Sequence, residues 1–189
     1  MPKIDQQILD QIQPIVLVGG QSKRFGRDKL IEHIDGSPLV ATPINILRAV
    51  FGPRVAIVGQ CDPQIASFAD RVIDDPYPGL GPVGGICAAL EHARSDIFVC
   101  AGDLISIDET TICTIIDAST QNTHTHAYLA ANTRLHPTVG IYRSICTAAF
   151  KSAVESNLLK LGMVLDHASV RHVPVKDEAV RNINHLEDV

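Results

Sequence analysis

Short apolar runs alternate along this chain with segments whose apolar residues recur at helical spacing. Each run is rich in aliphatic residues and is bounded by turn-forming or charged residues, which is the pattern of a buried strand. In the first half of the chain we predict strands at 15–18, 54–58, 71–73 and 96–101. We predict helices between them at 39–51, 63–69 and 85–93. This alternation is typical of βα units on a largely parallel sheet.

The second half continues the alternation, with one exception. A helix is predicted over 108–118, where Asp108 is a suitable N-cap. The strands at 127–131 and 138–142 are separated only by the polar stretch NTRLHP, so we expect a hairpin rather than a parallel crossover. The remaining predicted elements are a helix over 144–156, a second helical stretch that ends near 167, and a strand at 170–175.

The first 13 residues stand apart from this pattern. Ile4, Ile8, Leu9 and Ile12 share one face of a helix. We therefore predict an N-terminal extension of unassigned role over 1–13 and a single domain over 14–189. A length of 189 residues with 46% hydrophobic composition suits one domain with a proper core.

Composition and charge narrow the classes of partner. A net charge of −5 argues against a nucleic-acid binder that relies on general electrostatics. No apolar run reaches the roughly 18 residues of a membrane span, and no charged-then-apolar leader begins the chain. The five cysteines are scattered without a CxxC pair, so we expect reduced thiols. These features predict a cytoplasmic protein that binds neither membranes nor nucleic acid.

The loop after the first predicted strand concentrates positive charge. Gly19 and Gly20 let the backbone turn sharply and approach a ligand closely. Four cations against one aspartate give the next ten residues a local charge of +3, and these cations are Lys23, Arg24, Arg27 and Lys29. Ligands of open α/β sheets bind outside the carboxyl ends of the strands. The loop is therefore well placed to hold a polyphosphate.

Two known glycine motifs do not account for the glycines of this chain. A Walker A loop requires Gly-Lys-Ser/Thr, whereas Gly26 is followed by Arg27 and Asp28. GLGPVG at 79–84 fits G-x-G-x-x-G, but 74–78 separate it from the preceding strand and its prolines stiffen it. We expect a structural loop with some ligand contacts there, not a dinucleotide-binding fingerprint.

Asp103 is a third candidate, just past the strand at 96–101. A carboxylate at that edge of the sheet can hold Mg²⁺, which prefers oxygen ligands and substrate phosphates. An aspartate after a strand is also a common turn former. The neighbouring polyphosphate loop is what favours the metal-binding role.

These motifs resemble those of a known family. LVGGQSKRFGRDK is similar to the signature loop of nucleotidyltransferases, above all of the molybdenum cofactor guanylyltransferases (the MobA family). The segments VIDD with GPVGGICAAL, FVCAGDLI, HPTVGIYR and NINHLEDV resemble further landmarks of that family, in the same order over 15–189. Departures from the family's pattern include Phe25 for Met, Gly102 where Cys is frequent, and His185-Leu186 for Thr-Pro.

The resemblance implies a three-layer α/β/α Rossmann-like nucleotidyltransferase fold with a mostly parallel central sheet. It implies transfer of GMP from GTP to molybdopterin that carries molybdenum, with release of pyrophosphate, in molybdenum cofactor biosynthesis. GTP and molybdopterin would be the substrates and Mg²⁺ the cofactor. The partners would be a GTP-binding adaptor protein and acceptor molybdoenzymes, and we expect a monomer.

The matched loop implies the nucleotide-binding residues. They are Leu17, Val18, Gly19, Gly20 and Lys29. The backbone amides of the two glycines would grip the triphosphate, with Leu17 and Val18 beside the base and ribose. Arg24 and Lys29 would be catalytic by offsetting charge on the leaving pyrophosphate, because phosphoryl-type transfer depends on alignment and charge neutralisation.

The later motifs imply the remaining site residues. Asp103 would be catalytic, would contact the nucleotide and would hold Mg²⁺, and Asp75 would contact the nucleotide or the metal. Asn182 and Asn184 would hydrogen-bond the pterin or its phosphate. His136 either borders the pterin site or is an ordinary turn histidine, and the sequence does not separate these two roles.

Other activities stay open at this point. A cytidylyltransferase that uses CTP, or a transferase that acts on another small phosphorylated acceptor, would carry a similar loop. Sugar nucleotidyltransferases usually have longer chains than this one. A nucleotide-binding module without catalysis is a further alternative. The one feature that favours it is that the residues next to Asp103 depart from the family's pattern.

Overall fold

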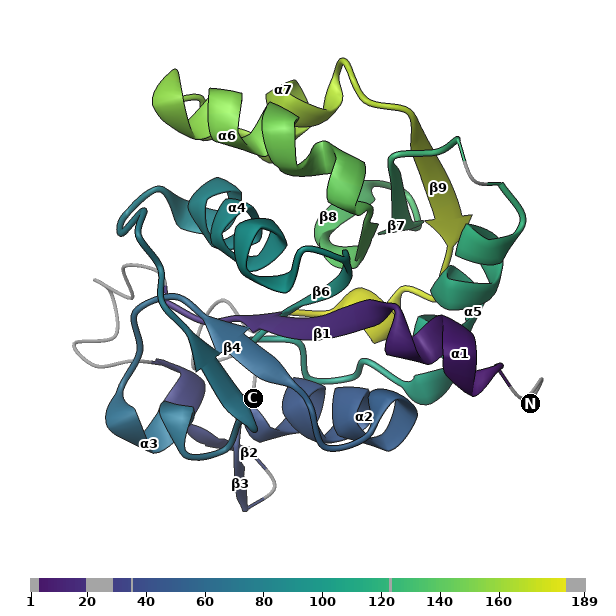
Figure 1. The fold of residues 1–189 in the computed structure, drawn as a ribbon. Coiled ribbons are helices and arrows are strands. Elements are labelled where there is room, and N and C mark those ends of the chain that lie inside the picture. The colour runs from purple at the N-terminus through teal and green to yellow at the C-terminus, as the bar shows by residue number, and fades with distance from the viewer. Residues whose placement is uncertain (1–3, 20–28, 35, 123, 183–189) are drawn as a thin grey trace.

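A seven-stranded sheet forms the centre of the computed structural model, which describes residues 4–19, 29–34, 36–122 and 124–182 (Figure 1). The strand order is β5-β4-β1-β6-β8-β7-β9. The strands are β1 (Ile12–Leu17), β4 (Ala56–Val58), β5 (Arg71–Ile73), β6 (Asp96–Ala101), β7 (Ala127–Ala131), β8 (Leu135–Tyr142) and β9 (Val170–Pro174). Within this seven-stranded sheet, β8 pairs antiparallel with β6 and β7, and the other four pairings are parallel. The predicted, mostly parallel sheet is confirmed.

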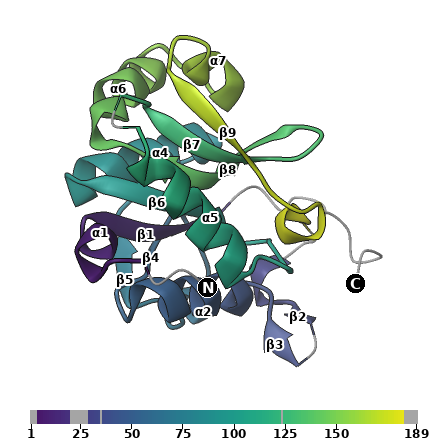
Figure 2. The ribbon, with the colours of Figure 1, turned by 90° about the vertical axis from the view of Figure 1, so that its right-hand side faces the viewer.

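Helices cover both faces of this sheet (Figures 1 and 2). One face carries α1 (Gln6–Asp10), α2 (Ala41–Phe51), α3 (Pro63–Ala66) and α5 (Glu109–Thr120). The other carries α4 (Gly81–Ala93), α6 (Thr147–Glu155) and α7 (Leu161–Leu165). Short elements complete the described chain: η1 (Lys29–Ile31), the antiparallel pair β2 (His33–Ile34) and β3 (Ser37–Pro38), η2 (Ser144–Cys146) and η3 (Glu178–Val180).

Alternation along the central strands builds a separate core on each face. Val16 of β1 packs in the cluster under α2 and α5, whereas its neighbour Ile15 packs in the cluster under α4 and α6. Both side chains are fully buried. Successive residues of a strand point to opposite faces, so a strand covered on both sides reads as a continuous apolar run.

Several predicted elements coincide with the observed ones. β5, β6 and β7 have the predicted bounds, and β7 pairs with β8 as the expected hairpin. The Asp108 side chain caps α5 by accepting a hydrogen bond of 2.7 Å from the Thr111 amide. Three of the five cysteines are buried, namely Cys87, Cys100 and Cys146. In the described part of the chain, no helix has the length and apolar character needed to cross a bilayer.

The start of α4 differs from the prediction. The helix begins at Gly81 rather than Gly85, so GPVGG forms its first turns instead of a loop. Pro82 suits this place, because the first N–H groups of a helix have no intrahelical partner and proline has none to lose.

The first strand and β8 also begin earlier than predicted. β1 starts at Ile12, which pairs with Asp96, so two residues assigned to the N-terminal extension lie in the central sheet. β8 starts at Leu135 instead of Thr138 and contains Pro137. A register irregularity in the β7–β8 pairing, at Leu129/Ala130, accommodates this proline, which cannot donate to the ladder.

The order of the strands locates the ligand-binding edge. From β1 the chain passes to β4 and β5 on one side, and then returns through α4 to β6 on the other side of β1. In open α/β sheets, ligands bind outside the carboxyl ends of the strands where the order reverses in this way. The carboxyl ends of β1, β4 and β6 are therefore the place to look for a site.

Candidate functional site

A cleft of about 440 Å³ opens at the carboxyl ends of β1 and β4, beside the first turns of α4. Its lining residues are Leu17, Val18, Gly19, Val58, Gly59, Gln60, Asp75, Gly79, Gly81, Pro82 and Gly85. Four of the sequence-predicted nucleotide-binding residues are among them: Leu17, Val18, Gly19 and Asp75. The structure therefore brings these four together around one cavity.

Backbone rather than side chains forms the floor of this cleft. Val18 donates its amide to the Val58 carbonyl at 2.9 Å, which joins the exits of β1 and β4. Gly59, with φ +119°, passes so close that an added Cβ would lie 1.8 Å from the Val18 carbonyl oxygen. Gly19, with φ +88°, leaves 2.6 Å between such a Cβ and the Gln60 carbonyl oxygen. Only glycine fits either position, and the absence of a side chain lets the two backbone segments approach closely here.

The opposite wall is the loop over 74–80 together with the N-terminus of α4. Asp75 accepts a hydrogen bond of 2.9 Å from the Tyr77 amide through one carboxylate oxygen. Leu80 occupies the N-cap position of α4 and makes no side-chain hydrogen bond to the helix. The first amides of a helix of 13 residues favour an anion, both through their hydrogen atoms and through the helix dipole.

Lys29 and Asp103 meet beside the cleft. The Lys29 Nζ atom lies 2.6 Å from Asp103 Oδ2, and the two side chains are 22% and 17% exposed. Asp103 lies two residues past the end of β6, and the amide of the intervening Gly102 donates to the Leu17 carbonyl at 3.0 Å. The carboxylate is thus held next to the end of β1, at the edge of the sheet predicted for it.

Three of the predicted site residues lie outside the described part of the chain. These are Gly20, Arg24 and Asn184. Their assigned roles therefore stay predictions.

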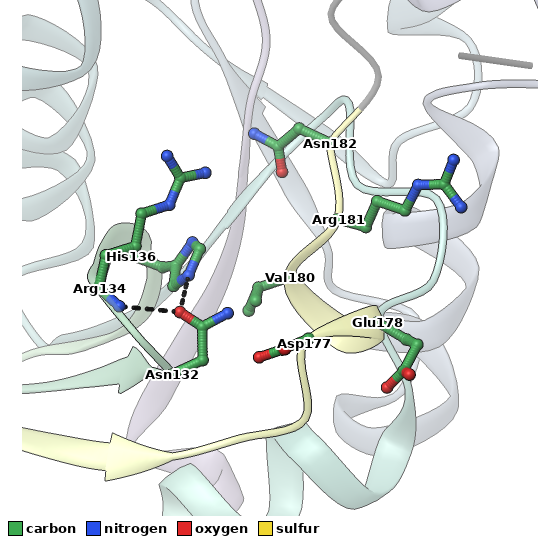
Figure 3. A pocket seen from close by; sticks show the side chains of 8 residues that line it. All are labelled: Asn132, Arg134, His136, Asp177, Glu178, Val180, Arg181 and Asn182. Carbon is green, nitrogen blue, oxygen red and sulfur yellow. Dashed lines mark hydrogen bonds between the residues drawn. The ribbon is translucent and has the colours of Figure 1, made fainter.

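A second pocket, of about 340 Å³, lies between the β7–β8 hairpin and the segment that follows β9 (Figure 3). Its lining residues are Asn132, Arg134, His136, Asp177, Glu178, Val180, Arg181 and Asn182. Figure 3 shows the Asp177 carboxylate pointing toward Asn132, whereas Glu178 and Arg181 extend away from the hairpin. The predicted pterin-binding residue Asn182 is therefore part of a polar pocket.

The chain around Asn182 is paired with the loop after Asp103. Leu104 and Asn182 form an antiparallel β-bridge, and the Ile105 amide donates to the Arg181 carbonyl at 3.3 Å. The second pocket is thereby fixed next to the ion pair. Along the edge of the sheet the order is the cleft at β5, β4 and β1, then Asp103 at β6, then the pocket at β8, β7 and β9.

Asn132 organises the hairpin wall of this pocket. Its Oδ1 atom accepts from the Arg134 amide at 3.0 Å and lies 2.8 Å from His136 Nε2. Because this oxygen can only accept, we assign the proton of the imidazole to Nε2. Burial, followed by the nearby Arg134 charge, lowers the pKa of His136 below its usual value of 6.5. The ring is therefore a neutral, oriented part of the wall.

The described residues include no group of three or more His, Cys, Asp or Glu side chains that could hold a metal ion. Asp103 supplies a single hard oxygen donor at the edge of the cleft. This donor set does not fit a structural zinc or calcium site, but it fits Mg²⁺, which takes most of its ligands from substrate phosphates and water.

Comparison with known families decides the class of the protein. A family model of the MobA-like NTP transferase domain matches residues 14–171. The chain belongs to the MobA-like NTP transferase family. It is accordingly a nucleotidyltransferase, and the suspected resemblance is confirmed.

Relatives of this MobA-like chain carry a consistent name. It is 26% identical over 178 residues to an Aquifex aeolicus protein named "Probable molybdenum cofactor guanylyltransferase", with 92% of this chain and 86% of the relative covered. A Pyrococcus horikoshii protein of the same name is 29% identical over 189 residues, with 92% and 95% covered.

Solved structures support the fold of the MobA-like domain. Molybdopterin-guanine dinucleotide biosynthesis protein A of Archaeoglobus fulgidus superposes with a TM-score of 0.75 at 22% identity, covering 93% of each chain. The 4-diphosphocytidyl-2C-methyl-D-erythritol synthase of Anaerococcus prevotii reaches 0.74 at 11% identity, covering 96% of this chain and 95% of the other. Identities this low show the fold alone, and the predicted Rossmann-like fold class is confirmed.

Sequence reasoning missed part of each cavity of the MobA-like domain. Gly59 and Gln60 carry no charge pattern, although a glycine directly after the buried strand β4 is the same signal that identified Gly19. Asn132 and Asp177 are ordinary turn and loop residues in the sequence. They reach one pocket only because β7 pairs with both β8 and β9.

Proposed function

We propose that this protein is a molybdenum cofactor guanylyltransferase, which transfers GMP from GTP to the terminal phosphate of Mo-molybdopterin and releases pyrophosphate. The observation that carries the proposal is the Lys29–Asp103 ion pair, which lies between a backbone-floored cleft and a polar pocket in a MobA-like domain. The names of the relatives favour GTP and molybdopterin as the substrates.

The cleft at β1, β4 and α4 binds GTP. Leu17 and Val18 lie beside the base and ribose, and the amides of Gly19 and Gly20 grip the triphosphate. The helix N-terminus at Gly81 adds a favourable field for the phosphates. One carboxylate oxygen of Asp75 accepts a hydrogen bond from the Tyr77 amide in the same loop, and the other oxygen contacts the nucleotide.

Asp103 would hold Mg²⁺, which would supply neutralisation of the phosphate charge. The Lys29 ammonium and, from the neighbouring loop, Arg24 offset the charge that develops on the leaving pyrophosphate. In this structure Lys29 and Asp103 are paired with each other, so both charges are already at the site where the nucleotide phosphates are proposed to bind.

The second pocket binds the acceptor. Asn182 and Asn184 hydrogen-bond the pterin or its phosphate, and Asn132, Arg134 and Asp177 complete a wall of donors and acceptors. The acceptor phosphate is already an oxyanion near neutral pH, so the reaction needs no general base. His136 fits this account, because its Nε2 proton is committed to Asn132 and it orients the wall.

Further parts of the proposal concern the cellular setting. The enzyme acts as a monomer in the cytoplasm, with a GTP-binding adaptor protein and acceptor molybdoenzymes as partners. A CTP-dependent activity is not favoured, since the likeness to the cytidylyltransferase fold comes at 11% identity and shows the fold alone.

A panel of nucleotides tests the proposed function. The purified full chain is incubated with Mg²⁺, molybdopterin loaded with molybdate, and one of GTP, CTP, ATP or UTP, while pyrophosphate is measured. We expect release with GTP. Release with CTP alone would overturn the guanine assignment, and no release with any of the four would favour a binding module without transferase activity.

A further inference from the structure

The loop over 74–80 forms a wall of the nucleotide cleft without belonging to a helix or strand. It connects the three-residue strand β5 to α4, and it contributes Asp75 and Gly79 to the cleft. Gly79 has φ +83° and open space around it. The position of this wall therefore depends on the contacts that the loop makes outside the cleft.

Tyr77 connects this loop to α4 and, through Glu91, to α6. Its amide donates to Asp75 Oδ1 at 2.9 Å, and its hydroxyl donates to Glu91 Oε2, in the third turn of α4, at 2.7 Å. The other oxygen of Glu91 lies 2.8 Å from the Lys151 ammonium on α6. One residue thus joins the aspartate of the cleft wall to a carboxylate fixed between α4 and α6.

The protonation states strengthen this connection. The hydrogen bond from Lys151, followed by that from Tyr77, lowers the pKa of Glu91. The hydrogen bond to Glu91, followed by burial, raises the pKa of Tyr77 well above its usual range. Near neutral pH the phenol therefore stays a donor and the carboxylate a charged acceptor. Such charge-assisted hydrogen bonds are roughly twice as strong as neutral ones.

The backbone of Tyr77 also packs directly on α4. An added Cβ at Gly84 would lie 3.0 Å from the Tyr77 carbonyl oxygen and 3.1 Å from its Cβ atom. Glycine at this place in the helix therefore allows the loop to lie against the first turns of α4. This contact does not involve the Tyr77 hydroxyl, so a substitution at Gly84 can displace the same loop without removing the hydrogen bond to Glu91.

We propose that Tyr77 is a positioning residue for the nucleotide: its hydroxyl, held by Glu91, fixes the 74–80 loop so that Asp75 and Gly79 keep the wall of the cleft in place. This inference rests on the proposed function of the cleft as the nucleotide site. Tyr77 is not among the residues that line the cleft, and its hydroxyl is bonded to Glu91. Its loss should therefore weaken nucleotide binding and leave the chemical step nearly unchanged.

Tyr77→Phe tests the hydroxyl alone. We expect the KM for GTP to rise about tenfold, as for the loss of one hydrogen bond to a charged group, with kcat within about twofold of wild type. Gly84→Ala should also raise the KM for GTP, although it removes no hydrogen bond. Lys151→Met should have a smaller effect, because the half-exposed ammonium contributes little through its ion pair.

Tyr142→Phe is the matched control. It also removes one tyrosine hydroxyl bond, to the Pro137 carbonyl at 2.6 Å, but from the core rather than the cleft wall. We expect it to lower the free energy of unfolding while leaving the KM for GTP unchanged. If both tyrosine variants raised the KM equally, Tyr77 would have only a general structural role and the inference would be wrong.

Amide hydrogen exchange separates this inference from the proposed function. In Tyr77→Phe the amides of 74–80 should exchange faster than in wild type, in the absence of any nucleotide. Unchanged exchange overturns the inference whichever nucleotide the protein uses. A second outcome is faster exchange in Tyr77→Phe together with wild-type protein that fails to bind a fluorescent GTP analogue with Mg²⁺. This outcome would support the role of Tyr77 in holding the loop and would overturn GTP as the ligand of the cleft.

Discussion

Lys29 and Asp103 form an ion pair of 2.6 Å although they are 74 positions apart in the sequence. The pair joins the segment after the glycine loop of β1 to the residue that follows β6. It separates the cleft assigned to the nucleotide from the pocket assigned to the acceptor. If the proposed function is correct, both charges lie where the phosphates of the two substrates meet.

Removing either charge of this pair should damage catalysis far more than stability. We expect Asp103→Asn and Lys29→Ala each to lower turnover by about two orders of magnitude, as for the loss of one electrostatic contributor. The free energy of unfolding should change by about 1 kcal/mol or less, because the pair is partly exposed. Steady-state kinetics and urea unfolding check both parts. Wild-type turnover in either variant would show that the wrong residue has been assigned.

Gly59→Ala should disrupt the floor of the cleft. The new methyl group would collide with the Val18 carbonyl, in addition to the cost of about 1–3 kcal/mol for a strained backbone. Gly52→Ala is the control, because Gly52 also has a positive φ but open space around it. We expect loss of GTP binding only in Gly59→Ala, measured with a fluorescent analogue. Equal binding by the two variants would contradict the proposed floor.

Asn182→Ala should affect one substrate only. The KM for molybdopterin is expected to rise about tenfold through loss of a hydrogen bond, with the KM for GTP unchanged. Asn45→Ala, on the exposed side of α2, is the control and should change neither value. A raised KM for GTP in Asn182→Ala would show that Asn182 has been assigned to the wrong substrate.

His136 should make the stability of the protein fall in mild acid. Its pKa is lowered in the folded state, so the unfolded chain binds the proton more readily as the pH drops below about 6.5. The free energy of unfolding should then decrease more for wild type than for His136→Asn between pH 7.5 and 5.5. Urea unfolding at both pH values measures this difference, and equal decreases would refute the burial of a neutral imidazole.

Sequence patterns were sufficient where burial alone decides the structure. The bounds of β6 follow from a continuous apolar run that ends at Ala101, and the N-cap of α5 follows from Asp108. A similar local pattern predicts the glycines after β1 to be a ligand loop, of which Gly19 lines the cleft. These features depend on neighbours in the sequence, so local reasoning finds them.

Other features depend on contacts that are distant in the sequence. The glycines and proline at the start of α4 look like a loop in the sequence. In the fold they form a helix that lies against β1, where a Cβ added at Gly85 would be only 3.1 Å from Leu17 Cδ2. The acceptor pocket similarly requires the pairing of β7 with β9, which brings Asp177 to the hairpin. No local pattern carries that information.

The most direct test of the account is the identity of the product when nucleotides compete. The full chain is given Mg²⁺, Mo-molybdopterin and equimolar GTP and CTP, and the pterin product is identified by mass spectrometry. The account predicts molybdopterin guanine dinucleotide as the main product, with one pyrophosphate released for each. A product that is mainly the cytosine dinucleotide, or pyrophosphate without any dinucleotide, would contradict it.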